Sequence, residues 1–97
     1  MYLAITNVKP KDNYILILTY ENNENRQFDM KPYLDIGIFQ ELKNLSMFKT
    51  VKTSFDTIVW DNGADFDPEI LYQKSVIDLW SESQNFEYIS SNQFRYN

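Results

Sequence analysis

Five acidic side chains lie close together in the sequence: Asp56, Asp61, Asp65, Asp67 and Glu69. Segments rich in carboxylate oxygen can bind calcium or magnesium, but this spacing does not match the calcium-binding loop, which requires ligands at alternate positions and a bidentate glutamate near its twelfth residue. Two carboxylates can also serve as acid and base without histidine, as in glycosidases, although such chemistry requires a substrate cleft. A chain of 97 residues has little room for a cleft. We therefore predict no metal site, no cofactor site and no catalytic site.

The same segment carries strong signals for local structure. The run from Val59 to Tyr72 ends a strand, turns at residues 61–63 and enters a helix. An Asn-Gly pair is typical of a tight turn, Asp67 precedes the helix as an N-cap, and Pro68 occupies the first helical position, where an N–H is not needed. These roles explain most of the polar residues here and leave Asp65 without an assigned role.

Composition excludes several classes of function. The chain has no cysteine, which excludes disulfides, thiolate metal sites and a cysteine nucleophile, and it has no histidine, which removes the commonest general base and zinc ligand. Nine basic against fourteen acidic residues give a net charge of -5, the wrong sign for a surface that grips phosphates. We therefore expect no direct binding of nucleic acid.

Length and hydrophobic patterning favour one folded domain without a membrane segment. A chain of 97 residues can form one hydrophobic core, and its seven Phe, seven Tyr and two Trp argue against disorder. The residues from Met1 to Lys9 lack the continuous apolar run of a signal peptide, and no segment approaches the ~20 apolar residues of a membrane helix. We therefore expect a cytoplasmic protein without membrane contact.

The residue pattern predicts a small α+β domain that begins with an antiparallel β-meander. Its strands are expected at Leu3–Val8, Tyr14–Tyr20 and Arg26–Met30, because β-branched and aromatic residues are dense there and polar turns separate them. The second strand carries apolar side chains on both faces and is expected at the centre of the sheet. The turn at residues 21–25 is rich in Asn, which tolerates the left-handed backbone of tight hairpins.

Short helices and a second hairpin are expected after the meander. Pro32 opens a helical region with apolar residues spaced by three and four, and Gly37 divides it into two short helices. Asn44 or Ser46 can cap a further helical turn. The remaining elements are a β-hairpin of Thr50–Phe55 with Thr57–Trp60 and a helix at Pro68–Lys74.

The last part of the chain differs in composition from the rest. We divide the sequence into a compact domain at residues 1–74 and a C-terminal extension at residues 75–97, which is rich in Ser, Asn and Gln but also contains scattered large apolar side chains. A disordered tail would carry fewer of them. We expect the extension to pack back on the domain, to bind a partner, or both.

The candidate partner-binding residues fall into two groups. The first group lies at the turn that follows the second hairpin and consists of Trp60, Asp61, Asn62 and Asp65. Trp60 is either an exposed anchor or a core residue, and the core is the commoner position for a tryptophan at a strand end. The second group is chosen because aromatic side chains are frequent anchors of protein contacts. It lies in the extension and consists of Trp80, Phe86 and Tyr88.

Several short motifs resemble the bacterial domain of unknown function 2442 family. The matching motifs are Glu21–Glu24, Phe28–Met30, Pro32–Leu34, Gly37–Phe39, Phe48–Val51 and Trp60–Tyr72, of which the last is the most specific. The match covers roughly residues 1–74. The sequence departs from the family at Asn23, where the family often has glycine, but asparagine can adopt the same backbone conformation. The resemblance implies a compact α+β domain without an established activity.

The resemblance also implies a regulatory setting. Some members carry a helix-turn-helix domain after this one, and members are often encoded beside proteins of the domain of unknown function 4160 family, an arrangement that looks like a toxin–antitoxin pair. The 23 residues of the extension are too few for a helix-turn-helix domain. We therefore expect a non-enzymatic protein-interaction or regulatory domain, antitoxin-like, that binds a small basic protein.

Two other functions stay open at this point. One is a sensory or ligand-binding domain that is separated from its DNA-binding companion. The other is an acidic decoy that inhibits a nucleic-acid-binding protein, for which the net charge of -5 is suitable. Assembly into a homo-oligomer also stays open.

Overall fold

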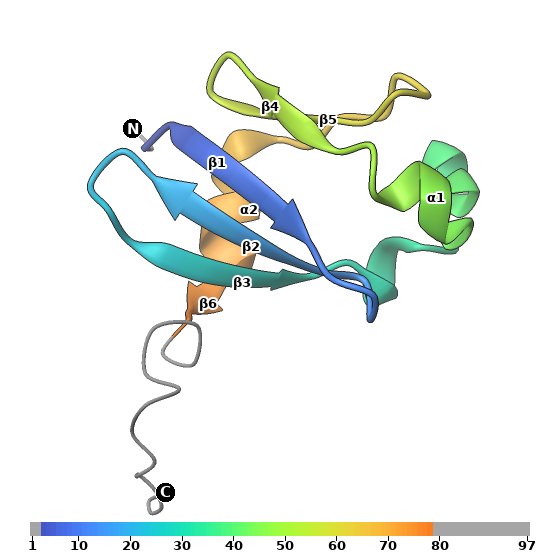
Figure 1. Cartoon of the computed structure of the whole chain (residues 1–97), viewed down its shortest axis with the longest axis horizontal. Helices are drawn as coiled ribbons and strands as arrows, with labels where there is room; N and C mark the ends of the chain where they lie inside the picture. The colour runs from blue at the N-terminus through green and yellow to red at the C-terminus, as the bar shows by residue number, and fades with distance from the viewer. Residues whose placement is uncertain (1–2, 79–97) are drawn as a thin grey trace, which may run out of the picture.

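A four-stranded antiparallel sheet forms the body of the molecule (Figure 1). The computed structural model describes residues 3–78, and the sheet contains β1 (Ile5–Pro10), β2 (Ile15–Tyr20), β3 (Asn25–Asp29) and β6 (Val76–Ile77) in the order β1-β2-β3-β6. Tight turns join the first three strands, which confirms the predicted meander and the central position of β2. The α+β fold class is confirmed as well.

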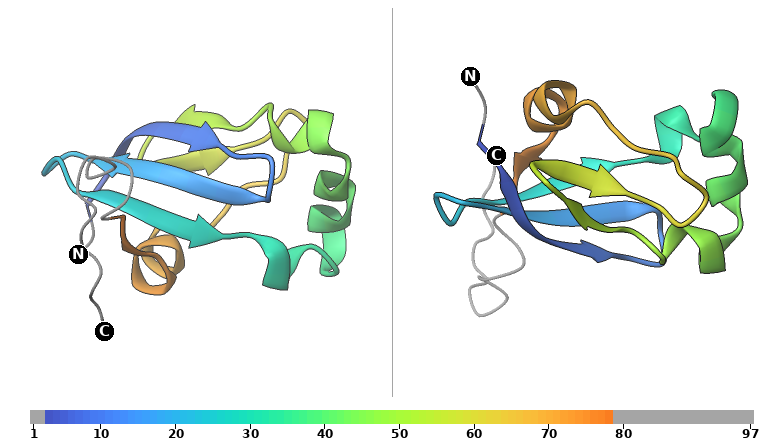
Figure 2. Two further views of the ribbon diagram at one scale, coloured as in Figure 1. Left: turned by 60° about the horizontal axis from the view of Figure 1, so that its bottom comes forward. Right: turned by 90° about the horizontal axis from the view of Figure 1, so that it is seen from above.

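The two faces of this sheet have different surroundings. The side chains of Leu16, Leu18 and Tyr20 on β2 are buried, and helix α2 (Pro68–Lys74) packs on this inner face (Figure 2). The alternate side chains of β2 point to the outer face and are only partly buried. The hydrophobic core therefore lies between the inner face, α2 and the second half of the chain.

A second, two-stranded sheet lies beside β1 (Figure 1). It consists of β4 (Lys52–Ser54) and β5 (Thr57–Val59), which form the predicted second hairpin. Ile58 is fully buried in the same core cluster as the side chains of the main sheet. The two sheets therefore enclose one hydrophobic core.

The helical middle of the chain consists of short helices, as predicted, but two of them are 3-10 helices. The elements are η1 (Lys31–Tyr33), η2 (Gly37–Lys43) and α1 (Leu45–Phe48). Gly37 begins η2 with φ +50°, a backbone conformation that suits glycine, and so separates the first two helices. Asn44 caps α1, since its Oδ1 accepts a hydrogen bond from the Met47 N–H at 3.2 Å.

Helix α2 begins as the sequence predicted. Oδ1 of Asp67 accepts hydrogen bonds from the N–H groups of Glu69 at 2.8 Å and Ile70 at 3.4 Å, and Pro68 occupies the first helical position. Two N–H groups that have no partner within the helix are thereby satisfied. The predicted N-cap is confirmed.

The folded region continues beyond the predicted boundary after residue 74. Strand β6 pairs antiparallel with β3, and the N–H of Asp78 donates to the carbonyl oxygen of Asn25 at 2.7 Å. Ser75 and Asp78 are both buried. The residue pattern does not predict this strand, because a two-residue strand has no periodicity of its own and forms only where β3 offers an edge.

Three tight turns share one backbone geometry. Tyr14, Asn23 and Gly63 have φ values of +65°, +70° and +90°, and each occupies the fourth position of a five-residue loop closed by a backbone hydrogen bond of 2.8 to 2.9 Å. This is a type I turn followed by a left-handed residue. Asn23 therefore does adopt the conformation expected for glycine, whereas Asn62 precedes the left-handed position and does not have a positive φ.

Candidate interaction surface

The β4–β5 hairpin ends in an exposed aromatic side chain. Phe55 is 99% exposed and has φ +55°, a left-handed conformation that is uncommon for a bulky residue. Glycine or asparagine would form the bend at a lower conformational cost. We call residues 54–57 the Phe55 tip. Sequence analysis missed it because Phe55 was assigned to the strand; the available signal was a tight bend that lacks glycine and asparagine.

An acidic segment runs beside β5, next to the Phe55 tip. The Oγ1 of Thr57 donates a hydrogen bond to the carbonyl oxygen of Phe66 at 2.6 Å, which holds the segment against the start of the strand. Asp65, Asp67 and Glu69 are exposed and form no ion pair within residues 3–78. We call these three residues the acidic flank. Asp65, which had no structural role in the sequence, belongs to this surface.

Trp60 belongs to the core, and its interpretation as an exposed anchor is wrong. The side chain is 1% exposed, and its Nε1 donates a hydrogen bond to the carbonyl oxygen of Phe48 at 2.9 Å. The rings of Phe39 and Phe48 lie 6.2 and 6.4 Å away, centroid to centroid. A tryptophan with its N–H satisfied and its ring surrounded by aromatic side chains stabilises the fold and is unavailable to a partner.

Asp61 and Asn62 fasten the turn after β5 to neighbouring elements. The Nδ2 of Asn62 donates to Oε1 of Glu41 in η2 at 2.9 Å, and the backbone N–H of Asp61 donates to Oγ1 of Thr50 at 3.0 Å. This turn and the Phe55 tip lie at opposite ends of the second hairpin (Figure 1). The structure therefore does not bring the predicted turn residues into one site with the exposed aromatic. Trp80, Phe86 and Tyr88 lie outside the described residues.

A polar cluster around Arg26 joins β3 to the end of α2. Arg26 donates from Nε to Oγ of Ser75 at 2.6 Å and from Nη2 to its carbonyl oxygen at 3.0 Å, and its Nη1 lies 2.9 Å from Oε1 of Glu24. The guanidinium also stacks 4.2 Å above the ring of Tyr72. Hydrogen bonds from Arg26 and from the Tyr72 hydroxyl hold the pKa of Glu24 below its usual range. Sequence analysis missed this cluster because Ser75 follows Arg26 by 49 residues and Tyr72 follows Glu24 by 48.

Comparison with protein families shows to which family this chain belongs. The model of the family named "Protein of unknown function (DUF2442)" matches residues 5–76. This chain belongs to the DUF2442 family. The family match ends at the first residue of β6 and so extends past the predicted domain boundary at residue 74. Comparisons of this chain with curated proteins and with solved structures find no match.

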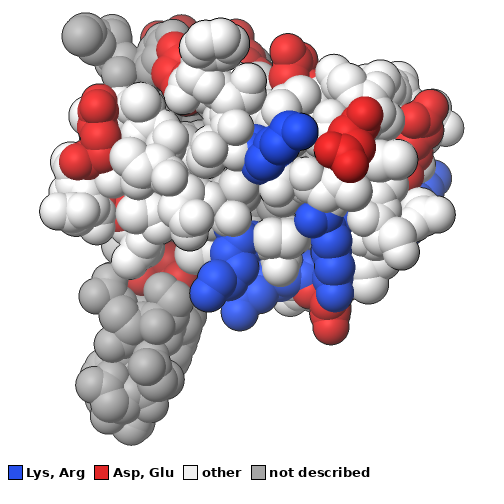
Figure 3. All heavy atoms as spheres, turned by 45° about the horizontal axis from the view of Figure 1, so that its top comes forward, with Lys and Arg blue, Asp and Glu red and all other residues white. Residues whose placement is uncertain are grey.

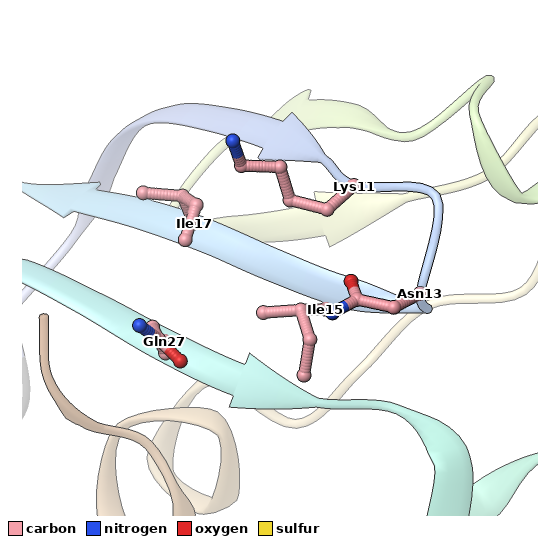
Figure 4. Close-up of a pocket in the computed structure, with 5 residues that line it drawn as sticks. All are labelled: Lys11, Asn13, Ile15, Ile17 and Gln27. Carbon is pink, nitrogen blue, oxygen red and sulfur yellow. The ribbon is translucent and has the colours of Figure 1, made fainter. Parts of the chain in front are cut away.

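A shallow hollow lies on the outer face of the main sheet of this DUF2442 domain (Figure 4). It has a volume of about 240 Å³, is open to solvent and is lined by Lys11, Asn13, Ile15, Ile17 and Gln27. Pockets that bind small molecules usually enclose roughly 300–1,000 Å³ and bury most of the ligand. The hollow is therefore better suited to a side chain or a segment of polypeptide than to an enclosed small molecule.

Residues 3–78 contain neither a cluster of candidate metal ligands nor a helix suited to cross a membrane. No three acidic side chains of this region are placed close enough together to hold a metal ion, although Asp61, Asp65 and Asp67 are close in sequence. No helix of this region has the length and apolar content needed to cross a membrane.

Proposed function

We propose that this DUF2442 domain is a non-enzymatic interaction domain with a regulatory, antitoxin-like role: it binds and restrains a small basic protein in the cytoplasm. The observation that carries the proposal is Phe55, an aromatic side chain that is 99% exposed on a left-handed backbone. Such backbone conformations cost free energy and are concentrated at functional positions. Phe55 thus has an unfavourable backbone conformation, and its side chain does not contribute to the hydrophobic core.

The Phe55 tip has the physical properties of an anchor. A phenylalanine buries a large apolar area with only two rotatable side-chain bonds, and aromatic anchors at the centre of an interface carry much of the binding energy. The Phe55 ring is almost completely exposed and therefore packs against almost nothing within residues 3–78. Its transfer into an apolar pocket of another protein would therefore be favourable.

The acidic flank supports a basic partner. Asp65 and Glu69 carry charges that are neither paired nor buried within the described residues, and the net charge of the chain is -5. Complementary charge at the edge of an interface accelerates association and selects the partner, while the apolar centre supplies most of the affinity. A partner with an apolar pocket bordered by Lys or Arg would match both features.

The alternative of a ligand-binding domain has weaker support. The hollow in the main sheet is small and open, and it contains no buried polar side chain that would orient a ligand. An acidic decoy would use the same flank, but no observation beyond charge favours it. The interaction proposal accounts for Phe55 as well as for the charge.

Capture of the partner from the source organism tests this proposal. Full-length tagged chain, Phe55→Asn and Ile36→Asn would be compared, since Ile36 is also exposed, at 56%, and lies outside the tip. We expect a basic protein to be retained by the natural chain and by Ile36→Asn and to be lost with Phe55→Asn, while all three proteins remain folded and neither variant melts below the natural chain by more than a few degrees. Retention of the same protein by Phe55→Asn would contradict the proposal.

A further inference from the structure

The outer face of the main sheet is uncovered by the described residues. One row of neighbouring side chains crosses all four strands and consists of Lys9, Ile17, Gln27 and Val76. Helix α2 covers the opposite face (Figure 1), whereas the Gln27 side chain of this row donates a hydrogen bond to Asp78 at the end of β6. Ile15 and Ile17 remain partly exposed and Val76 is 62% exposed. Ile15 and Ile17 on β2 and Val76 on β6, with Gln27 between them, therefore form an interrupted apolar stripe on this face.

Positive charge borders this stripe in a molecule that is acidic overall. Lys9 and Lys11 are exposed and form no ion pair within residues 3–78. Figure 3 shows several Lys and Arg side chains gathered on one part of the molecular surface. In Figure 4, Lys11 lies on the same side of the sheet as Ile15 and Ile17. The face thus suits a segment that combines apolar and acidic side chains.

The chain leaves the described region beside this face. Asp78, the last described residue, is buried and accepts a hydrogen bond on Oδ1 from Nε2 of Gln27 at 2.8 Å. Gln27 also lines the hollow. The last described residue therefore lies at the β6 edge of the outer face, at the end of the row that begins with Lys9 on β1.

We propose that residues 79–97 lie across the outer face of the main sheet. The segment contains Trp80, Phe86, Tyr88 and Phe94, which can cover Ile15, Ile17 and Val76, and its acidic residues Glu82 and Glu87 complement Lys9 and Lys11. Its nineteen residues reach up to about 60 Å when extended, whereas four strands spaced by about 4.8 Å span less than 20 Å. Length does not limit this path.

A second copy of the chain fits this face less well. Two outer faces packed together would bring the unpaired Lys9 and Lys11 side chains of both molecules into one interface, which is unfavourable without added acidic groups. The segment after Asp78 brings its own carboxylates and is already attached at the edge, so its effective concentration is high. This inference does not depend on the proposed partner of Phe55.

Thiol labelling tests the proposal in the full-length chain, because the natural sequence contains no cysteine. Ile17→Cys places a single thiol in the middle of the face. A second protein carries the same change together with Trp80→Ser, Phe86→Ser and Tyr88→Ser. We expect a maleimide to react about tenfold or more slowly with the first protein, because the thiol would react only when the segment opens. Val76→Cys repeats the comparison at an exposed position that does not affect the core.

Phe55→Cys is the matched control, since this position is fully exposed and lies outside the outer face. It should react at the same rate with either version of the segment. Lys9→Glu with Lys11→Glu should accelerate labelling of Ile17→Cys in the natural chain. Equal labelling rates of Ile17→Cys, and of Val76→Cys, with both versions of the segment would overturn the proposal and leave the face to another protein.

Discussion

Two aromatic residues with a left-handed backbone differ in what surrounds them. Tyr14 packs edge-on against Phe48, with ring centroids 5.1 Å apart, and its hydroxyl donates to the carbonyl oxygen of Lys43 at 2.5 Å. These contacts offset a backbone cost of about 1–2 kcal/mol. Phe55 has the same kind of backbone but is exposed to solvent. Tyr14 therefore serves the fold, whereas Phe55 is expected to serve a contact outside it.

The same substitution should consequently have opposite effects at the two positions. Phe55→Asn should stabilise the domain by about 0.5–1 kcal/mol, because asparagine tolerates positive φ. Tyr14→Asn should destabilise it by about 2 kcal/mol or more, because the ring contact and hydroxyl bond are lost. Urea unfolding of each variant measures both values. A loss of stability in Phe55→Asn would mean that the tip has a structural role.

The buried hydroxyl of Tyr20 contributes little to stability. Burial raises its pKa to about 12, and the oxygen makes no hydrogen bond of good geometry in the described part of the chain, although the Ser75 side chain lies near it. Tyr20→Phe should therefore leave the free energy of unfolding unchanged or raise it by up to about 1 kcal/mol. Tyr72→Phe should lower it by about 1 kcal/mol, because that hydroxyl donates to Glu24. Equal losses in both variants would reveal a hydrogen bond between Tyr20 and the nearby Ser75.

At the scale of elements, local chemistry could be predicted and long-range pairing could not. Asn44 and Asp67 cap helices with their own side chains, and Asn23 forms its turn within five residues. Each of these features is determined by a few neighbouring residues and can therefore be predicted from the local sequence. Strand β6 instead depends on an edge of β3 and on Arg26, which binds Ser75 49 residues later. The exposed Phe55 had no signal beyond an unusual bend.

The cap of α2 and the acidic flank can be separated by two substitutions. Asp67→Ala should lower the free energy of unfolding by roughly 1 kcal/mol, because two N–H groups lose their acceptor. Asp65→Ala should change it little, because its exposed side chain forms no ion pair in residues 3–78. Thermal melting of the two proteins compares them directly. Similar losses would indicate that both carboxylates take part in one structural site.

The attachment of β3 to α2 should weaken in acid. The pKa of Glu24 lies below its usual value of 4.5 in the folded protein, chiefly because Arg26 donates a hydrogen bond to the carboxylate. Stability from this group is therefore present above pH 4.5 and is lost as the pH falls through the lower folded pKa. Glu24→Gln should lower stability at pH 7 and reduce its acid dependence. An unchanged acid dependence, measured by urea unfolding between pH 7 and pH 3, would contradict this assignment.

At the scale of the whole molecule, charge is divided between two surfaces. The acidic flank lies beside the Phe55 tip, while Lys9 and Lys11 lie at the outer face of the main sheet. The net charge of -5 describes the chain but not this division. If the partner recognises the flank, position should matter more than net charge, since screening limits exposed charges to about 8 Å at physiological ionic strength.

Two variants of equal net charge distinguish these cases. Asp65→Asn with Glu69→Gln removes two charges from the acidic flank, and Asp29→Asn with Asp35→Asn removes two exposed charges elsewhere, so that both chains change from -5 to -3. We expect the protein captured through Phe55 to be released from the flank variant at a clearly lower salt concentration than from the natural chain, while the control variant stays close to it. An equal decrease of the releasing salt concentration in both variants would show that the partner responds only to net charge. The specific contact surface would then consist of the Phe55 tip alone.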